Sequence, residues 1–229
     1  MPISFSKGFS ITPNVVSNNI VSSGLLLQLD ANSLTSYPGS GTTVYDLTNS
    51  YNHTLIGATF TTLNGIKCFD CTTGTNRVDV NGTGPTLPST GYTYVTWARI
   101  IPSSTNWRSL LRTTNNVPIL VQIGTDDLGY YGSGGIVFQD SGYNVTSDED
   151  VWVQYAIVGD NVSQTFYING SQVGTVAYGA GGDTHFGWGN NQTAGQPFGH
   201  VANLYLYNRK LSIAEITQNY NAIKPTYGL

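Results

Sequence analysis

The pattern around which the chain is organised runs from residue 151 to residue 178. In VWVQYAIV (151–158), odd-numbered residues fall on one side and even-numbered residues on the other, which is the two-residue period of a strand. A second run, 164–168, leads into Asn169-Gly170, a pair that accepts the positive φ angles of a tight hairpin. A third strand follows. Because such a meander buries little by itself, the rest of the chain must supply a partner sheet.

Further apolar runs predict the other strands. Residues 25–30 are apolar on both faces, which is typical of a central strand. Residues 92–101 alternate regularly, and we expect Val95, Trp97 and Ile101 to face the core. The remaining strand candidates are 54–57, 59–63, 66–70, 76–80, 107–112, 117–123, 135–139, 185–188 and 200–208.

The two ends of the chain differ from this pattern. Ser212 and Glu215 form a capping-box pattern, and apolar residues then recur at helical spacing until Pro225, which predicts one helix over about 212–224. Residues 1–22 have no periodicity and are expected to form an extended arm, leaving one domain over 23–229. The apolar side chains of the arm can lie on this domain or on a neighbouring subunit. The residues that we expect to dock the arm on such a surface are Ile3, Phe5, Phe9 and Ile11.

Composition narrows the function classes. The 229 residues include 27 Gly and 15 Tyr, and only 10% are charged, as in short strands joined by polar turns. With a net charge of -4 and no basic stripe, the chain is not expected to bind nucleic acid. No apolar run approaches the roughly 20 residues that span a bilayer, and the N-terminus lacks the apolar core of a secretory signal. We therefore expect no membrane span and no export by a cleaved signal.

Several segments together carry a family likeness. The most specific is the terminal strand-loop-helix, and the full set is GLLLQLDA (24–31), YPGSGTTVYDLTNSYNHTLIGATF (37–60), KCFDC (67–71), YTYVTWARI (92–100), VWVQYAIV (151–158), TFYINGSQVGT (165–175) and FGHVANLYLYNRKLSIAEITQNYNAIK (198–224). The set resembles the laminin-G-like, concanavalin A-like jelly rolls, especially the single-domain versions found in structural proteins of tailed phages and large viruses. The resemblance implies an all-β fold of two stacked antiparallel sheets, with the short C-terminal helix packed at the edge.

The residues do not favour catalysis. Some relatives of this fold are glycoside hydrolases that carry two glutamates and an aspartate alternating on one strand, because retaining hydrolysis needs a pair of carboxylates. This chain has two glutamates: Glu149 lies in an acidic turn, and Glu215 is explained by helix capping. Ser133 lacks the first glycine of a G-x-S-x-G elbow. We expect a protein that is not an enzyme.

Soft ligands are also few. Cys68 and Cys71 form a lone C-x-x-C without the further ligands of a zinc site. On a continuous strand their sulfurs would point to opposite faces, so we expect free, partly buried thiols. His53, His185 and His200 are far apart in sequence and are expected at the surface or at the rim of the fold.

Calcium is the metal that the resemblance favours, because several jelly-roll relatives hold it at one end of the sandwich. Asp30, Asp46 and Asp70 occupy the positions that the resemblance aligns, although this chain departs from the family's D-x-x-D-Y pattern after Asp70. The alternative is that strand-end aspartates accept hydrogen bonds from turn amides. No cofactor other than calcium is implied.

A sugar site needs hydrogen-bonding groups and an aromatic stacking face on loops. The long loop after the meander has this chemistry together with two tyrosines, and its alternative is a solvated rim. The candidate carbohydrate-binding residues are Tyr130, Tyr131, His185, Trp188, Asn190 and Asn191.

Two functions follow from these observations. The favoured hypothesis is a non-enzymatic virion component, a capsid decoration or tail-associated protein assembled in the host cytoplasm. It would be a homo-oligomer or present in many copies, dock on other virion proteins (capsid or tail) through residues 1–22 and display the jelly roll. The alternative is a carbohydrate-binding lectin or adhesin that recognises host-surface glycans.

Overall fold

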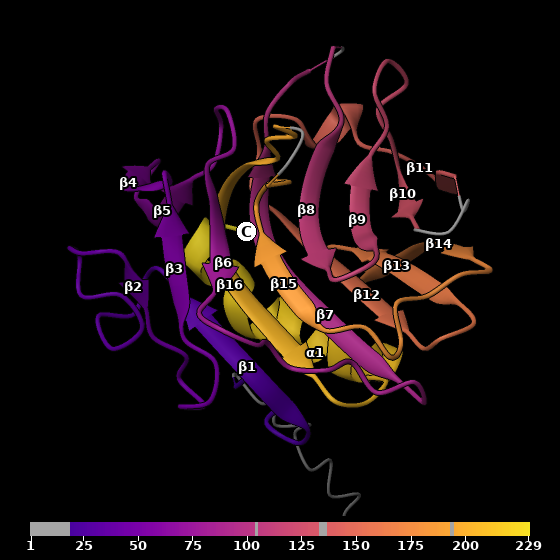
Figure 1. Ribbon diagram of the computed structural model, residues 1–229, viewed down its shortest axis with the longest axis horizontal. Helices are drawn as coiled ribbons and strands as arrows, with labels where there is room; N and C mark the ends of the chain where they lie inside the picture. Colours follow the sequence, from indigo (N-terminus) through magenta and orange to yellow (C-terminus); the bar gives the residue numbers. More distant parts are fainter. Residues whose placement is uncertain (1–18, 104, 133–136, 193–194) are drawn as a thin grey trace, which may run out of the picture.

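A computed structural model describes residues 19–103, 105–132, 137–192 and 195–229. Two antiparallel sheets lie face to face, and one α-helix follows the last strand (Figure 1). The predicted fold class, an all-β sandwich with a short C-terminal helix, is confirmed. The four docking residues predicted in the arm, Ile3, Phe5, Phe9 and Ile11, lie outside the described residues.

In the described part of the chain each sheet has eight strands. Sheet A runs in the order β14 (Ser171–Val176), β13 (Gln164–Ile168), β12 (Val153–Gly159), β7 (Tyr92–Ile100), β16 (Gly199–Tyr207), β5 (Ile66–Asp70) and β4 (Thr59–Leu63), with β1 (Leu25–Asp30) also paired to β16. Sheet B runs in the order β11 (Gln139–Asn144), β10 (Asp127–Tyr131), β9 (Val117–Val121), β8 (Arg108–Thr113), β15 (His185–Trp188), β6 (Arg77–Val80), β3 (His53–Ile56) and β2 (Thr43–Val44). The helical elements are η1 (Thr146–Asp148), α1 (Ile213–Ile223) and η2 (Lys224–Tyr227).

The predicted meander forms β12, β13 and β14. Its hairpin turn uses Asn169 and Gly170 with φ angles of 49° and 80°, as the sequence predicts. β12 then pairs with β7 on its other side, so the meander continues into the middle of sheet A. Val153, Tyr155 and Ile157 point into the core between the sheets.

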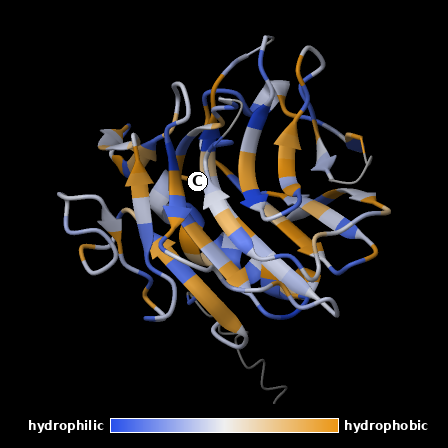
Figure 2. Cartoon of the chain, in the orientation of Figure 1, coloured by the Kyte–Doolittle hydropathy of each residue, from blue (hydrophilic) through white to orange (hydrophobic). Residues whose placement is uncertain are grey.

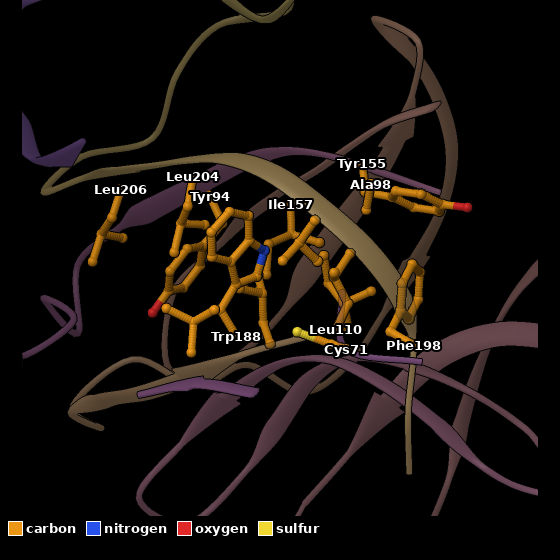
Figure 3. Packing of buried hydrophobic residues seen from close by; sticks show 14 of the residues in the cluster. Cys71, Tyr94, Ala98, Leu110, Tyr155, Ile157, Trp188, Phe198, Leu204 and Leu206 are labelled. Atoms are coloured by element: carbon orange, nitrogen blue, oxygen red, sulfur yellow. The ribbon is translucent and has the colours of Figure 1, made fainter. Parts of the chain in front are cut away.

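The core between the sheets is built from alternate residues of both sheets. Hydrophobic residues concentrate on the strands, whereas many loops are hydrophilic (Figure 2). Trp188 of sheet B lies within this core together with Tyr94 and Leu204 of sheet A (Figure 3). Its indole Nε1 donates a hydrogen bond to Thr96 Oγ1 of sheet A at 3.1 Å, so the core also contains a polar link between the sheets.

The predicted orientation of Val95 and Trp97 on β7 is wrong. Tyr94 and Ala98 of β7 face the core between the sheets, whereas Val95 and Trp97 point to the opposite side of sheet A. There the helical C-terminal segment covers them, and the Trp97 ring stacks on Tyr227 with centroids 4.0 Å apart. Both faces of β7 are therefore buried, and hydrophobic alternation alone could not distinguish them.

The C-terminal helix begins as predicted. Ser212 accepts a hydrogen bond from the Glu215 backbone N–H, and the Glu215 side chain accepts one from the Ser212 backbone N–H. The helix lies behind sheet A in the view of Figure 1. In the described part of the chain, no helix is long and apolar enough to cross a membrane.

Two further predictions have mixed outcomes. Cys68 lies in the cluster under the helix and Cys71 in the core between the sheets, so the free thiols point to opposite faces as expected, although both are fully buried.

The strand predicted over 135–139 overlaps β11 only at Gln139, and part of it lies outside the described residues. β10 was not predicted, because Asp127 and Gly129 interrupt its apolar pattern.

Candidate functional site

The outer face of sheet B carries an open hollow of about 370 Å³. Strands β8 and β9, the turn between them, the end of β10 and the loop between β15 and β16 all contribute to it. Two buried side chains of β9 form its apolar part, and polar or aromatic groups form most of the remainder. The lining residues are Trp107, Arg112, Asn115, Asn116, Val117, Leu120, Tyr131, Gly132, Asn191 and Gln196.

A β-bulge gives this face its shape. Leu120 pairs with Gly129 and Val117 pairs with Tyr131, so three steps along β9 match two steps along β10. Ile119 lies between them and points into the core. Because of the bulge, Val117 and Leu120 line the same hollow although they are three residues apart in sequence.

Two aromatic rings stand at this hollow. Trp107, just before β8, is half-buried, and Tyr131, at the end of β10, is 42% exposed. Their ring centroids are 6.2 Å apart with an interplanar angle of 70°, and the Phe138 ring centroid lies 5.6 Å from that of Trp107 at 62°. These edge contacts fix the orientation of the indole, which offers a flat apolar surface beside polar groups.

The amides of the lining are held in place by hydrogen bonds. Asp183 accepts from the side-chain Nδ2 of Asn115 at 2.8 Å and of Asn116 at 2.7 Å. Gln196 Oε1 accepts from Ser109 Oγ at 2.5 Å and from Asn191 Nδ2 at 3.2 Å. Because these side chains are anchored before any ligand arrives, a ligand that uses them loses little side-chain entropy.

Arg112 supplies the positive charge of the lining. Its guanidinium donates to Asn191 Oδ1, and its buried Nε has no hydrogen-bond partner. Burial lowers the pKa of Arg112, and the nearby carboxylate of Asp79 opposes this effect. An arginine stays charged at physiological pH even with such a shift.

The carbohydrate-binding residues predicted from the sequence divide into two groups. Tyr131 and Asn191 line the hollow. The other four are buried, with exposed fractions of 0 to 1%, so they cannot stack on a sugar or bond to one, and the prediction is wrong for them: Tyr130, His185, Trp188 and Asn190.

The buried positions have structural explanations. Tyr130 and Trp188 alternate into the core because their neighbours on β10 and β15 take the outer positions. Asn190 Nδ2 donates to the backbone oxygens of Gly74 and Asn76 at 3.0 Å each, which fastens the start of the loop between β15 and β16.

The predicted calcium ligands bond to the backbone of their own turns. Asp46 accepts hydrogen bonds from four backbone N–H groups at 2.9 to 3.1 Å, Asp30 accepts from Asn32 at 2.8 Å, and Asp70 accepts from Thr72 at 2.9 Å. Among the residues that the structure describes, no three His, Cys, Asp or Glu side chains are grouped to hold a metal ion. These aspartates organise turns, which was the alternative interpretation.

The expectation for the histidines is also wrong in part. His53 and His185 are buried, with exposed fractions of 0% and 1%, and their Nε2 atoms are 3.2 Å apart. His200 is half-buried on β16. The sequence contains no indication of this contact because the two histidines are 132 residues apart. They meet because β3 and β15 pair with opposite sides of β6 in sheet B.

The profile of the Concanavalin A-like lectin/glucanases superfamily matches residues 72–217, which is more than half of the chain. The chain belongs to this superfamily. The match includes Trp107, Arg112, Tyr131 and Asn191, so the hollow lies within the matched part of the concanavalin A-like domain. A sequence search of curated proteins gives no match.

Solved structures share the fold of this concanavalin A-like domain at low identity. Trypanosoma rangeli sialidase in complex with sialic acid has a TM-score of 0.65 at 14% identity, over 90% of this chain and 34% of that chain. Domain 4 of AbnA, a GH43 extracellular arabinanase from Geobacillus stearothermophilus, in complex with arabinotriose, has a TM-score of 0.65 at 16% identity, over 86% and 98%. The binding domain of Paraclostridial Mosquitocidal Protein 1 has a TM-score of 0.63 at 15% identity, over 87% and 52%. The chain thus spans about one third of the sialidase.

Sequence reasoning missed most of the hollow. The sequence pattern places Trp107 and Arg112 on a predicted strand and indicates no binding role for them or for the Asn115-Asn116 turn. One signal was present: Trp107 is a large aromatic residue inside the polar stretch SSTNWRS (103–109). A tryptophan in such a context is a candidate for a surface that binds a ligand.

Proposed function

We propose that this domain binds carbohydrate in the hollow on the outer face of sheet B. The observation that carries the proposal is the combination, in one open site, of the Trp107 and Tyr131 rings with anchored amides. A sugar ring has an apolar face that packs on an aromatic ring and hydroxyl groups that bond to amides. The similar AbnA domain, which is solved with arabinotriose, supports this choice.

We also propose that the domain binds without hydrolysing. Within the described part of the chain, the lining of the hollow includes no aspartate or glutamate. Hydrolysis of a glycosidic bond needs two carboxylates placed on either side of it. Incubation of the protein with each bound saccharide is expected to release no reducing ends, and release above a buffer control would contradict this proposal.

The binding proposal is tested with a glycan array, followed by calorimetric titration of the saccharides that bind. Trp107→Ala is expected to weaken binding at least tenfold, because aromatic stacking on a sugar is lost. Tyr45→Ala is the matched control, since Tyr45 is 46% exposed and does not line the hollow. An unchanged saccharide affinity in Trp107→Ala would mean that the sugar binds elsewhere and would contradict the proposal.

The virion role expected from the sequence stays a prediction. It depends on the arm over 1–22, of which residues 1–18 lie outside the described residues. Deleting residues 2–22 and measuring incorporation into particles tests it, and full incorporation of the shortened chain would defeat the docking arm. A virion protein can also display a sugar-binding hollow, so the two proposals are compatible.

A further inference from the structure

We infer that the hollow selects saccharides that carry a carboxylate, and that Arg112 is the residue that selects them. This inference rests on the carbohydrate-binding function proposed above and adds the chemical class of the ligand. It is carried by the ion pairs of the molecule rather than by the aromatic rings.

Arg112 differs from every other arginine of the chain. Four arginines each have a carboxylate within 3.0 Å. Arg112, although described in full, has no carboxylate within ion-pair distance, and its side chain bonds to the neutral Asn191. The paired arginines are Arg77 with Asp79, Arg99 with Asp150, Arg108 with Asp126 and Glu149, and Arg209 with Glu215.

The carboxylate that acts on Arg112 is that of Asp79, and it already forms an ion pair with another arginine. Arg112 and Asp79 both stand opposite Gly187, on the two sides of β15. The Asp79 carboxylate, however, receives a hydrogen bond from Arg77 Nε at 2.6 Å. This part of sheet B therefore has two guanidinium groups for one carboxylate, and it carries a local positive charge in a chain whose net charge is -4.

The position of Arg112 makes this charge reachable. Its half-buried side chain lines the hollow beside Trp107 and also a second, smaller hollow of about 210 Å³ with Phe186 and Gln192. A guanidinium forms paired hydrogen bonds with a carboxylate, which is the strongest geometry available to it. A neutral sugar in the same place would cover the cation without supplying an anion, which costs binding energy.

Two sources can supply a sugar carboxylate: uronic acids within polysaccharides and terminal sialic acids. The experiment uses both. Calorimetry compares oligogalacturonate with its methyl ester, which has the same ring and linkage but no charge, and compares sialyllactose with lactose. At least one acid is expected to bind tenfold or more tightly than its neutral counterpart, and the source is whichever pair shows that difference.

Three variants distinguish recognition by the Arg112 guanidinium from a nonspecific effect of positive charge. Arg112→Gln is expected to abolish the preference, so that the acid and its neutral counterpart bind this variant with affinities within about twofold of each other. Arg112→Lys keeps the positive charge but loses the paired N–H donors of the guanidinium, so this variant is expected to retain only part of the preference for the acid. Lys67→Gln removes one positive charge from sheet A without breaking an ion pair and is expected to retain the full preference. Denaturation curves check that each variant is folded.

The outcomes are distinguishable. Equal affinity for acid and neutral forms, or a preference that survives Arg112→Gln, would overturn the inference and leave the carbohydrate-binding function intact. If no saccharide binds, or if binding is independent of Trp107, the proposed function fails and the inference fails with it. A preference that Lys67→Gln reduces equally would show a nonspecific charge effect and would also overturn the inference.

Discussion

The Nε2 atoms of His53 and His185 lie 3.2 Å apart inside the sandwich, and a chain of hydrogen bonds fixes their protonation. His53 Nδ1 is 2.8 Å from the carbonyl oxygen of Tyr51, which can only accept, so Nδ1 carries the proton and Nε2 accepts. His185 must then donate from Nε2. Its Nδ1 accepts from the Tyr94 hydroxyl of sheet A at 3.0 Å. Every group is satisfied when both imidazoles are neutral.

Acid is therefore expected to destabilise the fold. Burial lowers the pKa of His53 from 6.5 to about 4 and also lowers the pKa of His185. The unfolded chain binds these protons near pH 6.5, whereas the folded chain does not, so the free energy of unfolding falls as the pH drops from about 6.5 towards 4. For His53 alone the shift corresponds to about 3 kcal/mol. Urea denaturation at a series of pH values measures it.

The histidine contribution can be isolated. The double variant His53→Leu with His185→Phe is expected to be less stable at pH 7 but to lose much less free energy between pH 6.5 and 4. His200→Gln, at the half-buried histidine of β16, is the control and is expected to keep most of the dependence. An unchanged free energy of unfolding of the native chain across this range would contradict the neutral pair.

Gly174 is expected to tolerate no side chain. A Cβ atom at this position of β14 would overlap the backbone oxygen of Ser141 in β11, where the edges of the two sheets meet. Because a backbone atom cannot rotate away, Gly174→Ala should cost about 2 kcal/mol of the free energy of unfolding. Thr175→Ala, at an exposed position of the same strand, is the control. A loss as small as that of the control would show that the edges can separate freely.

Tyr227 is expected to stabilise the C-terminal segment against sheet A. Its ring stacks on Trp97, and Asn203 Nδ2 donates to its hydroxyl at 3.1 Å. Tyr227→Ala should lower the free energy of unfolding by roughly 2 kcal/mol, and Tyr227→Phe, which keeps the ring, by about 1 kcal/mol. Thermal denaturation measures both. Equal losses for the two variants would mean that the stack contributes nothing.

The sequence predicts the fold well because local rules decide it. The Asn169-Gly170 turn, the β12 alternation and the Ser212 and Glu215 capping box each act within a few residues, and each is found as predicted. Such rules could not predict which side chains of β7 point into the core between the sheets. The alternation of β7 is apolar on both sides, since a helix more than a hundred residues later covers Trp97 and Val95.

The site was predicted poorly for a related reason. The hollow depends on a bulge that turns Val117 to the outer face, and a bulge shifts every side chain beyond it without an obvious signal in sequence. The polar character of a residue was also misleading, because Asn190 donates to the backbone oxygen of Gly74 and His185 bonds to the Tyr94 hydroxyl inside the fold, rather than to a ligand. Unpaired charge, the property that distinguishes Arg112, becomes visible only when all the ion pairs are known.

Trp107 is expected to report ligand binding through its fluorescence. The other three tryptophans, Trp97, Trp152 and Trp188, are at most 9% exposed and do not line the hollow. A saccharide that covers the half-buried indole of Trp107 removes water from it, so titration should shift or quench tryptophan emission with the same dissociation constant as calorimetry. In Trp107→Phe the signal should vanish while weakened binding persists, because the phenyl ring retains part of the stacking surface. A fluorescence change of full size that remains in Trp107→Phe would mean that another tryptophan gives the signal, and it would contradict the expectation that Trp107 reports binding.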